Sequence, residues 1–90
     1  MSEVTDNRAR SRYELVVDGH HAIAAYERDG AVLTFTHTVV PEALRGQGIA
    51  SRLIGGALAD VRARGLRIVA QCPFVADYID KHPDEADLLA

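Results

Sequence analysis

The sequence predicts an α/β fold in the order β-β-β-α-β-α, with a mixed and mostly antiparallel sheet. Two Asp-Gly pairs, at positions 18–19 and 29–30, separate runs that have the two-residue apolar period of strands. A helical apolar stripe follows over Ile49–Arg64. A short apolar run and a second, shorter helical pattern come after it, which favours a helical crossover between parallel strands.

Composition sets the broad class of the protein. The chain has 90 residues, of which 48% are apolar and 26% are charged, as in a small soluble globular domain. Its formal net charge of −3 argues against nucleic acid as the main partner. No apolar run approaches the ~20 residues needed to cross a bilayer, and the polar start Met1–Arg12 does not resemble a signal peptide. Because a single cysteine cannot form an internal disulfide, we expect a reduced, cytoplasmic protein.

The first half of the chain predicts a leader followed by a meander of strands. Residues 1–11 are polar and without apolar period, so we expect a flexible leader before a single domain over residues 12–90. Strands are expected at Arg12–Val17, His20–Glu27 and Ala31–Val40, joined by type I′ turns at the Asp-Gly pairs. The free edge of the first strand is able to pair with another copy, so we expect a monomer or a weak homodimer.

The second half predicts one long helix, one strand and one short helix. The pair Gly55-Gly56 inside Ile49–Arg64 costs roughly 1 kcal/mol per glycine relative to alanine, which predicts a close packing partner there. Arg67–Gln71 is expected to lie parallel to Ala31–Val40. A helix over Phe74–His82 should turn Phe74, Tyr78 and Ile79 inward, and the end of the chain should add a last turn that docks on the core.

The stretch His37–Leu53 contains the strongest functional signal. A strand ends in it, a turn with Gly46 and Gly48 follows, and a helix begins at once. The first N–H groups of such a helix lack partners and point at one spot, where the helix dipole adds positive charge. This arrangement predicts a phosphate or pyrophosphate site. The chain has no P-loop, and Ser51 stands where a dinucleotide fingerprint needs its third glycine.

The motif Arg45-Gly46-Gln47-Gly48-Ile49-Ala50 fits Arg/Gln-x-x-Gly-x-Gly/Ala, the acyl-CoA pyrophosphate motif of the GNAT acetyltransferase superfamily. A second motif, Cys72-Pro73-Phe74 followed by Tyr78-Ile79 and His82-Pro83, lies further along the chain. Together they resemble a group of very short, single-domain GNAT-like proteins, and the resemblance spans Tyr13 to Leu89.

This resemblance implies a reduced GNAT fold that binds acetyl-CoA or another acyl-CoA. Backbone N–H groups of Arg45–Ala50 would hold the pyrophosphate, and the pantetheine arm would lie along Thr36–Val40. The implied function is transfer of an acetyl group to an unidentified amine or thiol. The cofactor-binding residues implied or expected at this junction are Thr38, Val39, Val40, Arg45, Gly46, Gln47, Gly48, Ile49, Ala50 and Ser51.

The chain also departs from the full-length family pattern. The tight turn Asp18-Gly19 stands in place of two helices that help to bind the acceptor, and the closing strands after the last helix are missing. The resemblance therefore does not identify the acceptor substrate of this protein. A non-catalytic CoA-binding or protein-interaction module is the alternative function.

Three residues are candidates for catalysis. Cys72 is either a nucleophile that forms an acyl intermediate or a small buried residue. His37, on the Leu33/Phe35 face of a regular strand, is either a general base or a cap of the strand end. In the resemblance, Tyr78 is in register with the tyrosine that protonates the departing CoA thiolate; otherwise it is a core residue. Cys72, His37 and His82 lack the spacing of a zinc site, so no metal is expected.

Overall fold

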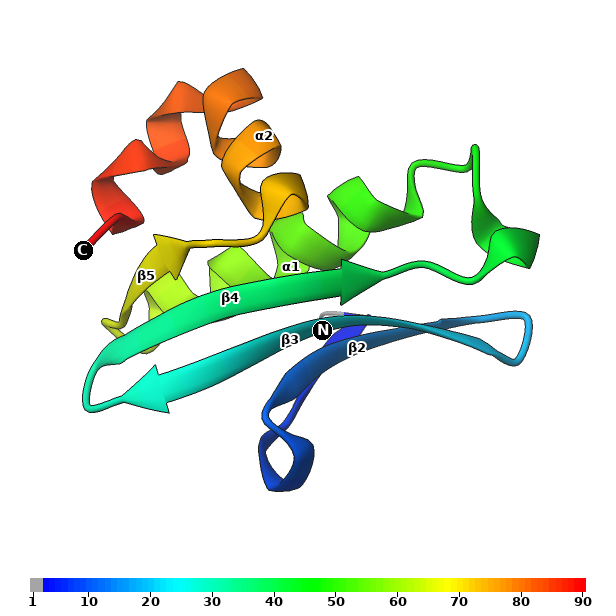
Figure 1. Cartoon of the computed structure of the whole chain (residues 1–90), viewed down its shortest axis with the longest axis horizontal. Coiled ribbons are helices and arrows are strands. Elements are labelled where there is room, and N and C mark those ends of the chain that lie inside the picture. Colours follow the sequence, from blue (N-terminus) through cyan, green and yellow to red (C-terminus); the bar gives the residue numbers. More distant parts are fainter. Residues whose placement is uncertain (1–2) are drawn as a thin grey trace.

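The computed structural model describes residues 3–90, and Met1 and Ser2 lie outside the described residues. One sheet contains five strands in the order β1-β2-β3-β4-β5 (Figure 1). Neighbouring strands are antiparallel except for β4 and β5, which are parallel. The predicted mixed, mostly antiparallel α/β fold is confirmed, with one more strand than expected. The strands are β1 Val4–Asn7, β2 Arg12–Val17, β3 His20–Asp29, β4 Val32–Val39 and β5 Arg67–Ala70.

Two α-helices and three 3₁₀ helices complete the fold over residues 3–90. The helix α1, Ile49–Ala63, lies behind the sheet in Figure 1, and α2, Pro73–Lys81, lies beyond β5. No helix within residues 3–90 is long and apolar enough to span a membrane. The 3₁₀ helices are η1 Arg8–Arg10, η2 Glu42–Leu44 and η3 Pro83–Leu88.

The core lies between α1 and one face of the sheet. The predicted apolar stripe of α1 is buried, with Leu53, Ala57 and Leu58 inaccessible to solvent. It meets an aromatic cluster on the strands, in which the Tyr13 ring lies 5.6 Å from Tyr26 and 6.0 Å from Phe35 between centroids. Burial of this much apolar surface is the main source of stability in such a domain.

The first strand was not expected from the sequence. Residues 1–11 predict a flexible leader, but Val4–Asn7 forms β1 and pairs with β2, with Val4 opposite Leu15. Val4 is buried, and it is the only apolar residue of this strand. A polar strand has no apolar period to read, which explains why the pattern missed it. β1 also covers the β2 edge that was expected to be free for pairing with another copy.

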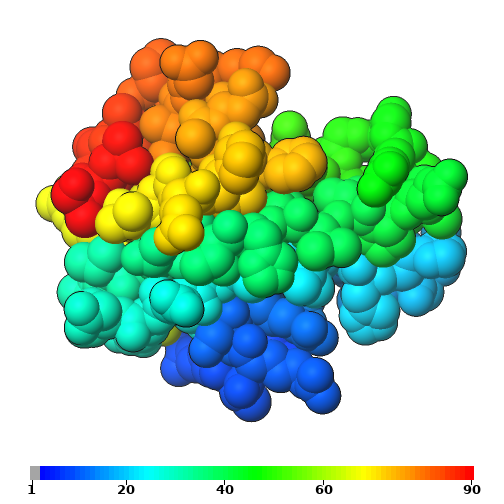
Figure 2. Space-filling model, in the orientation of Figure 1, coloured from blue at the N-terminus to red at the C-terminus, as the bar shows by residue number. Residues whose placement is uncertain are grey.

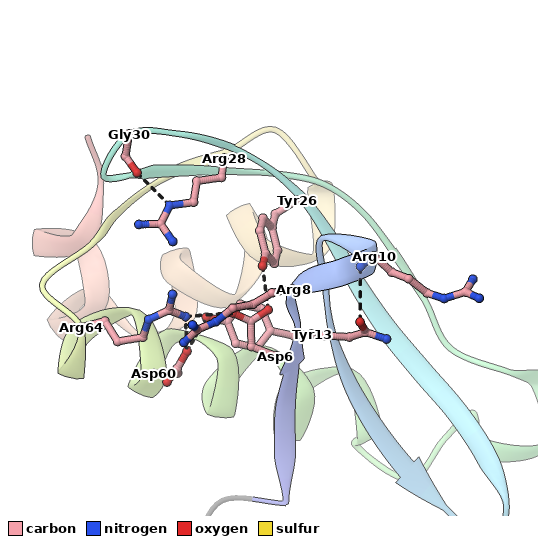
Figure 3. A network of polar contacts seen from close by, with 10 residues as sticks. Asp6, Arg8, Arg10, Tyr13, Tyr26, Arg28, Gly30, Asp60 and Arg64 are labelled. Carbon is pink, nitrogen blue, oxygen red and sulfur yellow. Dashed lines mark hydrogen bonds and ion pairs between the residues drawn. The ribbon is translucent and has the colours of Figure 1, made fainter.

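A polar network holds β1 against the end of α1 (Figure 3). Asp6 accepts hydrogen bonds from the Tyr26 hydroxyl at 2.7 Å and from the Arg64 guanidinium at 2.8 Å. Arg64 also donates to Asp60 at 3.0 Å, and Asp60 accepts from the Tyr13 hydroxyl at 2.6 Å. Burial and the hydrogen bond to Asp6 raise the pKa of Tyr26 to about 12. Burial would raise the pKa of Asp60, but the bonds from Tyr13 and Arg64 hold it below its ordinary value.

The two hairpin turns differ from one another. Asp18 and Gly19 both have positive φ, +50° and +78°, as the predicted type I′ turn requires. In the second hairpin Asp29 is the last residue of β3 and pairs with Val32, and only Gly30 has positive φ. This is the pattern of a type II′ turn at Gly30-Ala31, so the prediction of type I′ is wrong there.

A β-bulge changes which residues of β4 face the core. Tyr26 pairs with Phe35, but the preceding residue of β3, Ala25, pairs with His37, so Thr36 is an extra residue. An extra residue inverts the alternation of side chains beyond it. Phe35 is buried in the core, whereas His37 is exposed on the opposite face.

The second helix and the C-terminus pack along β5. Val75 and Ile79 are the buried residues of α2, while Phe74 is 51% exposed, so the prediction that Phe74 faces inward is wrong. The expected last turn is present as η3, and Leu88 is buried in the core. The backbone N–H of Ala90 donates to the carbonyl oxygen of Ile68 at 2.8 Å, which attaches the chain end to β5.

Gly55 has the close packing partner that its position inside a helix predicts. A Cβ at residue 55 would lie 2.9 Å from the Tyr78 hydroxyl oxygen and 3.6 Å from the Tyr78 ring carbon that carries it. The first distance is shorter than van der Waals contact allows, and the second is ordinary contact. Gly55 therefore allows α2 to approach α1 closely.

We expect Gly55→Ala to be stabilising only when the Tyr78 hydroxyl is absent. In Tyr78→Phe protein the alanine should gain about 1 kcal/mol from helix propensity, because its Cβ then meets only ring carbon. In the wild-type background the contact with the hydroxyl should cancel most of that gain. Urea unfolding of the four proteins in this double-mutant cycle measures the coupling. An equal effect of Gly55→Ala in both backgrounds would contradict this packing.

Candidate functional site

A groove of about 580 Å³ opens between the end of β4, the start of α1 and the start of α2. In Figure 2 it is the hollow between the green segment that follows β4 and the orange atoms of α2. The groove coincides with the junction at which the sequence predicts a phosphate site. Its lining residues are Thr38, Val39, Val40, Leu44, Arg45, Gly46, Gly48, Ile49, Ala50, Ser51 and Phe74.

The glycine turn leaves one wall of the groove as bare backbone. Gly46 and Gly48 have positive φ, +79° and +70°, which a side chain would strain. A Cβ added at either residue would meet no atom within 4 Å, so the space in front of the turn is open. Gly48 is the N-cap of α1 and provides no side-chain cap for the helix. The first N–H groups of α1 therefore have room for an anion in front of them.

The second wall is the unpaired edge of β4. The parallel pairing of β4 with β5 ends at Phe35 opposite Ala70, and the backbone N–H of Cys72 donates to the Phe35 carbonyl oxygen at 2.8 Å. Beyond this bond no strand of the described chain pairs with β4 on its α2 side. An extended amide-containing ligand is able to bind such an edge as an added strand would.

Arg45 provides a free cation at the mouth of the groove. Its side chain is exposed, and within residues 3–90 its guanidinium has no hydrogen-bond or ion-pair partner. Arg52, by contrast, is held by Glu3 with two hydrogen bonds. A guanidinium without a partner beside a bare helix N-terminus suits a phosphate group.

The structure brings together nearly all the predicted cofactor-binding residues. All of them line the groove except Gln47, whose side-chain amide donates to the Ala43 carbonyl oxygen at 3.2 Å. Sequence reasoning missed Leu44 and Phe74, which add apolar surface. Leu44 is a single apolar residue in a polar loop, and Phe74 belongs to the second motif but was assigned to the core. For both residues the available signal was a large apolar side chain inside or beside one of the two motifs.

The three predicted catalytic residues are not gathered at one point. Cys72 is 1% exposed, and its Sγ lies 3.2 Å from the Thr38 hydroxyl oxygen, so it lies behind a residue that lines the groove. His37 is exposed on the opposite face of the sheet because of the bulge, and its Nδ1 lies 3.2 Å from the Thr36 hydroxyl. The prediction that His37 shares the Leu33/Phe35 face is wrong, and its catalytic role stays a prediction.

Tyr78 lies beside the groove but does not line it. Its ring stacks on the His82 ring at 4.0 Å between centroids, and its hydroxyl lies against Gly55. Burial raises the pKa of Tyr78 above its ordinary value, and the carboxylates of Glu85 and Asp84 add to the rise. The phenol therefore stays protonated at neutral pH, as a proton donor must.

Residues 12–88 of the chain match the family described as GCN5-related N-acetyl-transferase. The chain belongs to this family. The match covers the strands β2–β5, both α-helices and the whole groove, so the predicted GNAT membership is confirmed.

Similar proteins agree with the family assignment. Protein NATD1 of Gallus gallus is 32% identical over 84 residues, which cover 90% of this chain and 76% of that protein. Protein NATD1 of Homo sapiens is 32% identical over 83 residues, covering 89% and 74%. A GCN5-like putative N-acetyltransferase from Staphylococcus aureus, solved by NMR, aligns with a TM-score of 0.71. At 23% identity, over 100% of this chain and 91% of that one, it shows the shared GNAT fold.

No cluster of three or more metal-binding side chains lies within residues 3–90. Cys72 contacts Thr38, and the His82 Nδ1 bonds to the Tyr78 carbonyl oxygen at 2.9 Å. The groove is lined by backbone groups, the free guanidinium of Arg45, the hydroxyls of Thr38 and Ser51, and apolar side chains.

We expect the Cys72 thiol to react slowly with a bulky aromatic disulfide in the native protein, because Thr38 separates its Sγ from the groove. Thr38→Ala should raise the rate several-fold by opening that path. Thr34→Ala, on the same strand but opposite β5 residue Val69, serves as the control and should leave the rate unchanged. Release of the coloured thiol gives the rates. A fast reaction of the folded wild-type protein would contradict the burial of Cys72.

Proposed function

We propose that this protein binds acetyl-CoA, or another acyl-CoA, in the groove and transfers the acyl group to an amine or thiol acceptor. One observation carries the proposal: the free edge of β4, the open glycine turn and the unpartnered Arg45 converge on a single groove at the start of α1. Few ligands other than CoA combine a chain of amides with a pyrophosphate. The family assignment supports the same class of ligand.

The residues present fit CoA. Backbone N–H groups from Gly46 to Ser51 would face the pyrophosphate, and Arg45 would add a guanidinium. The edge of β4 over Thr38–Val40 would bind the pantetheine amides. Leu44 and Phe74 would cover the apolar parts of the arm and exclude water from it. When bound, an acyl-CoA supplies an activated thioester.

The chain's own contribution to transfer would be positioning and polarisation. Backbone N–H groups at the parting of β4 and β5 are available to polarise a carbonyl that lies there. Tyr78 holds a proton on its hydroxyl at neutral pH. Cys72 lies one contact behind the groove, through Thr38. Turnover by the Cys72→Ala variant distinguishes a direct transfer from a transfer through Cys72.

A CoA-binding module without turnover is the second candidate function. The observation that favours it is the separation of the three candidate catalytic residues. His37 lies on the outer face of the sheet, Cys72 lies behind Thr38, and the Tyr78 hydroxyl lies against Gly55. This alternative shares the binding site with the first and differs only in the chemical step.

We expect acetyl-CoA to raise the unfolding temperature of the protein. At about 100 times its dissociation constant, a ligand stabilises the fold by about 2.7 kcal/mol. For a domain of this size that is a shift of roughly 10–20 °C. Thermal unfolding with acetyl-CoA, and with ADP as the control ligand, makes the measurement. No shift at millimolar acetyl-CoA would overturn the proposed function.

The variant Ser51→Asp tests the position of the site. Ser51 is exposed in the first turn of α1, where a carboxylate stabilises the helix but repels a phosphate. The variant should fold at least as well as the wild type and lose most of the acetyl-CoA shift. Ser51→Asn, nearly the same size but neutral, should keep it. An undiminished shift in Ser51→Asp would place the cofactor elsewhere.

We expect wild-type protein to release free CoA thiol from acetyl-CoA when supplied with a panel of amines and thiols. If Cys72 carries the acyl group, Cys72→Ala should lose this turnover and keep the thermal shift. If His37 is the base, His37→Ala should do the same. Retained turnover in both variants would remove these two assignments. Binding without any turnover in the wild type would support the module.

A further inference from the structure

A second, smaller hollow of about 70 Å³ continues from the proposed cofactor groove. The two share Ala50, Ser51 and Phe74, so they form one continuous concave surface. At its far end the second hollow reaches Lys81 and His82, at the end of α2. The proposed contacts with the pyrophosphate and the pantetheine arm of CoA do not involve Lys81 or His82.

Lys81 is the only lysine in the chain, and its ammonium group makes only a weak ion pair. It pairs with the Asp77 carboxylate, one helical turn earlier, at 3.0 Å between Nζ and Oδ2. The two side chains are 69% and 60% exposed, and an ion pair this exposed contributes little to stability. A phosphate group that enters the hollow is therefore able to replace Asp77 as the partner of Lys81 at small cost.

A ring stack and a hydrogen bond order the wall of this hollow. The rings of Tyr78 and His82 stack at 4.0 Å with an angle of 16° between them. The His82 Nδ1–H is in position to donate to the Tyr78 carbonyl oxygen, which lies 2.9 Å away and only accepts. Pro83 then ends the helix. The surface beside Lys81 is consequently already formed without a ligand.

The chemistry of CoA determines what must lie beyond the pyrophosphate. If pantetheine occupies the β4 edge and the pyrophosphate faces Gly46–Ser51, the remaining group is an adenosine that carries a 3′-phosphate. It leaves the pyrophosphate at the start of α1, where Ser51 lines both hollows. Of the residues that line the second hollow, Lys81 alone has a permanent positive charge.

We propose that Lys81 binds the 3′-phosphate of CoA and that Asp77 competes with this phosphate for the Lys81 ammonium. The proposal rests on the proposed function and adds to it a selectivity for 3′-phosphorylated CoA over 3′-dephospho-CoA. Lys81 contributes one charge-assisted contact, and Asp77 sets how readily that contact forms.

The test compares two ligands across the wild type, two variants of the Lys81 pair and one control variant. Titration calorimetry of CoA and 3′-dephospho-CoA against wild-type protein should show about fivefold tighter binding of CoA, the size of one exposed ion pair. Lys81→Gln should bind both ligands equally, at the affinity of the wild type for 3′-dephospho-CoA. Asp77→Asn should bind CoA more tightly than the wild type and leave 3′-dephospho-CoA unchanged.

Arg10→Gln is the matched control for the loss of one positive charge. The Arg10 side chain has no partner within residues 3–90, and it lies in η1, on the opposite side of the molecule from α2 in Figure 1. This variant should keep the preference for CoA. A preference that survives in Lys81→Gln, or one that disappears equally in Arg10→Gln, would overturn the role of Lys81.

The failures of the two proposals are distinguishable. If wild-type protein binds both ligands equally, the Lys81 contact is absent and the proposed function stands. If it binds neither ligand, both proposals fail together. Because Lys81 and Asp77 are exposed and lie outside the core, unfolding of the variants is not an expected outcome, and thermal unfolding without ligand checks this.

Discussion

The hydrogen bond from the Cys72 backbone N–H to the Phe35 carbonyl oxygen, at 2.8 Å, is the contact on which the site depends. It is the last backbone hydrogen bond between β4 and the chain leaving β5. On one side of it the sheet is continuous, and on the other side β4 has a free edge. The Cys72 carbonyl oxygen accepts from the N–H groups of Val75 and Ala76, so the residue that ends the pairing also begins α2. The groove exists because the strands part here and α2 leaves in another direction.

The same point explains the behaviour of the candidate catalytic residues. The bulge at Thr36 immediately follows Phe35, the last residue of β4 that pairs with β5, and it turns His37 away from the core face of the sheet and Thr38 toward it. Thr38 is thereby placed between the groove and the Cys72 sulfur, at 3.2 Å from it. A regular strand would have put His37 in the place that Thr38 takes. The backbone irregularity, not the identity of the residues, therefore decides which side chain the groove can use.

Regular elements could be predicted from the sequence because their patterns are local. β2 begins and ends at the expected residues, and α1 begins at Ile49 as predicted. The glycine motif likewise located the groove, since positive φ and an open helix N-terminus are properties of a short stretch. β1 could not be predicted, because the side-chain contacts that hold it include Tyr26 and Arg64, 20 and 58 residues from Asp6 along the chain. The bulge in β4 and the exposure of Phe74 could not be predicted from the sequence for a similar reason, because both depend on how separate elements pack together.

Electrostatics places a further constraint on any anionic ligand of this chain. The net charge is −3, so long-range attraction does not favour CoA, which is itself highly negative. Most arginines are already engaged: Arg62 is held by Asp87 and Glu85, and Arg64 by Asp6 and Asp60. Binding must then depend on short-range groups: the helix N–H dipoles, the free Arg45 and the loosely held Lys81. Backbone dipoles are fixed by the fold and need no counter-ion, so a small acidic domain is able to hold a phosphate without a basic surface.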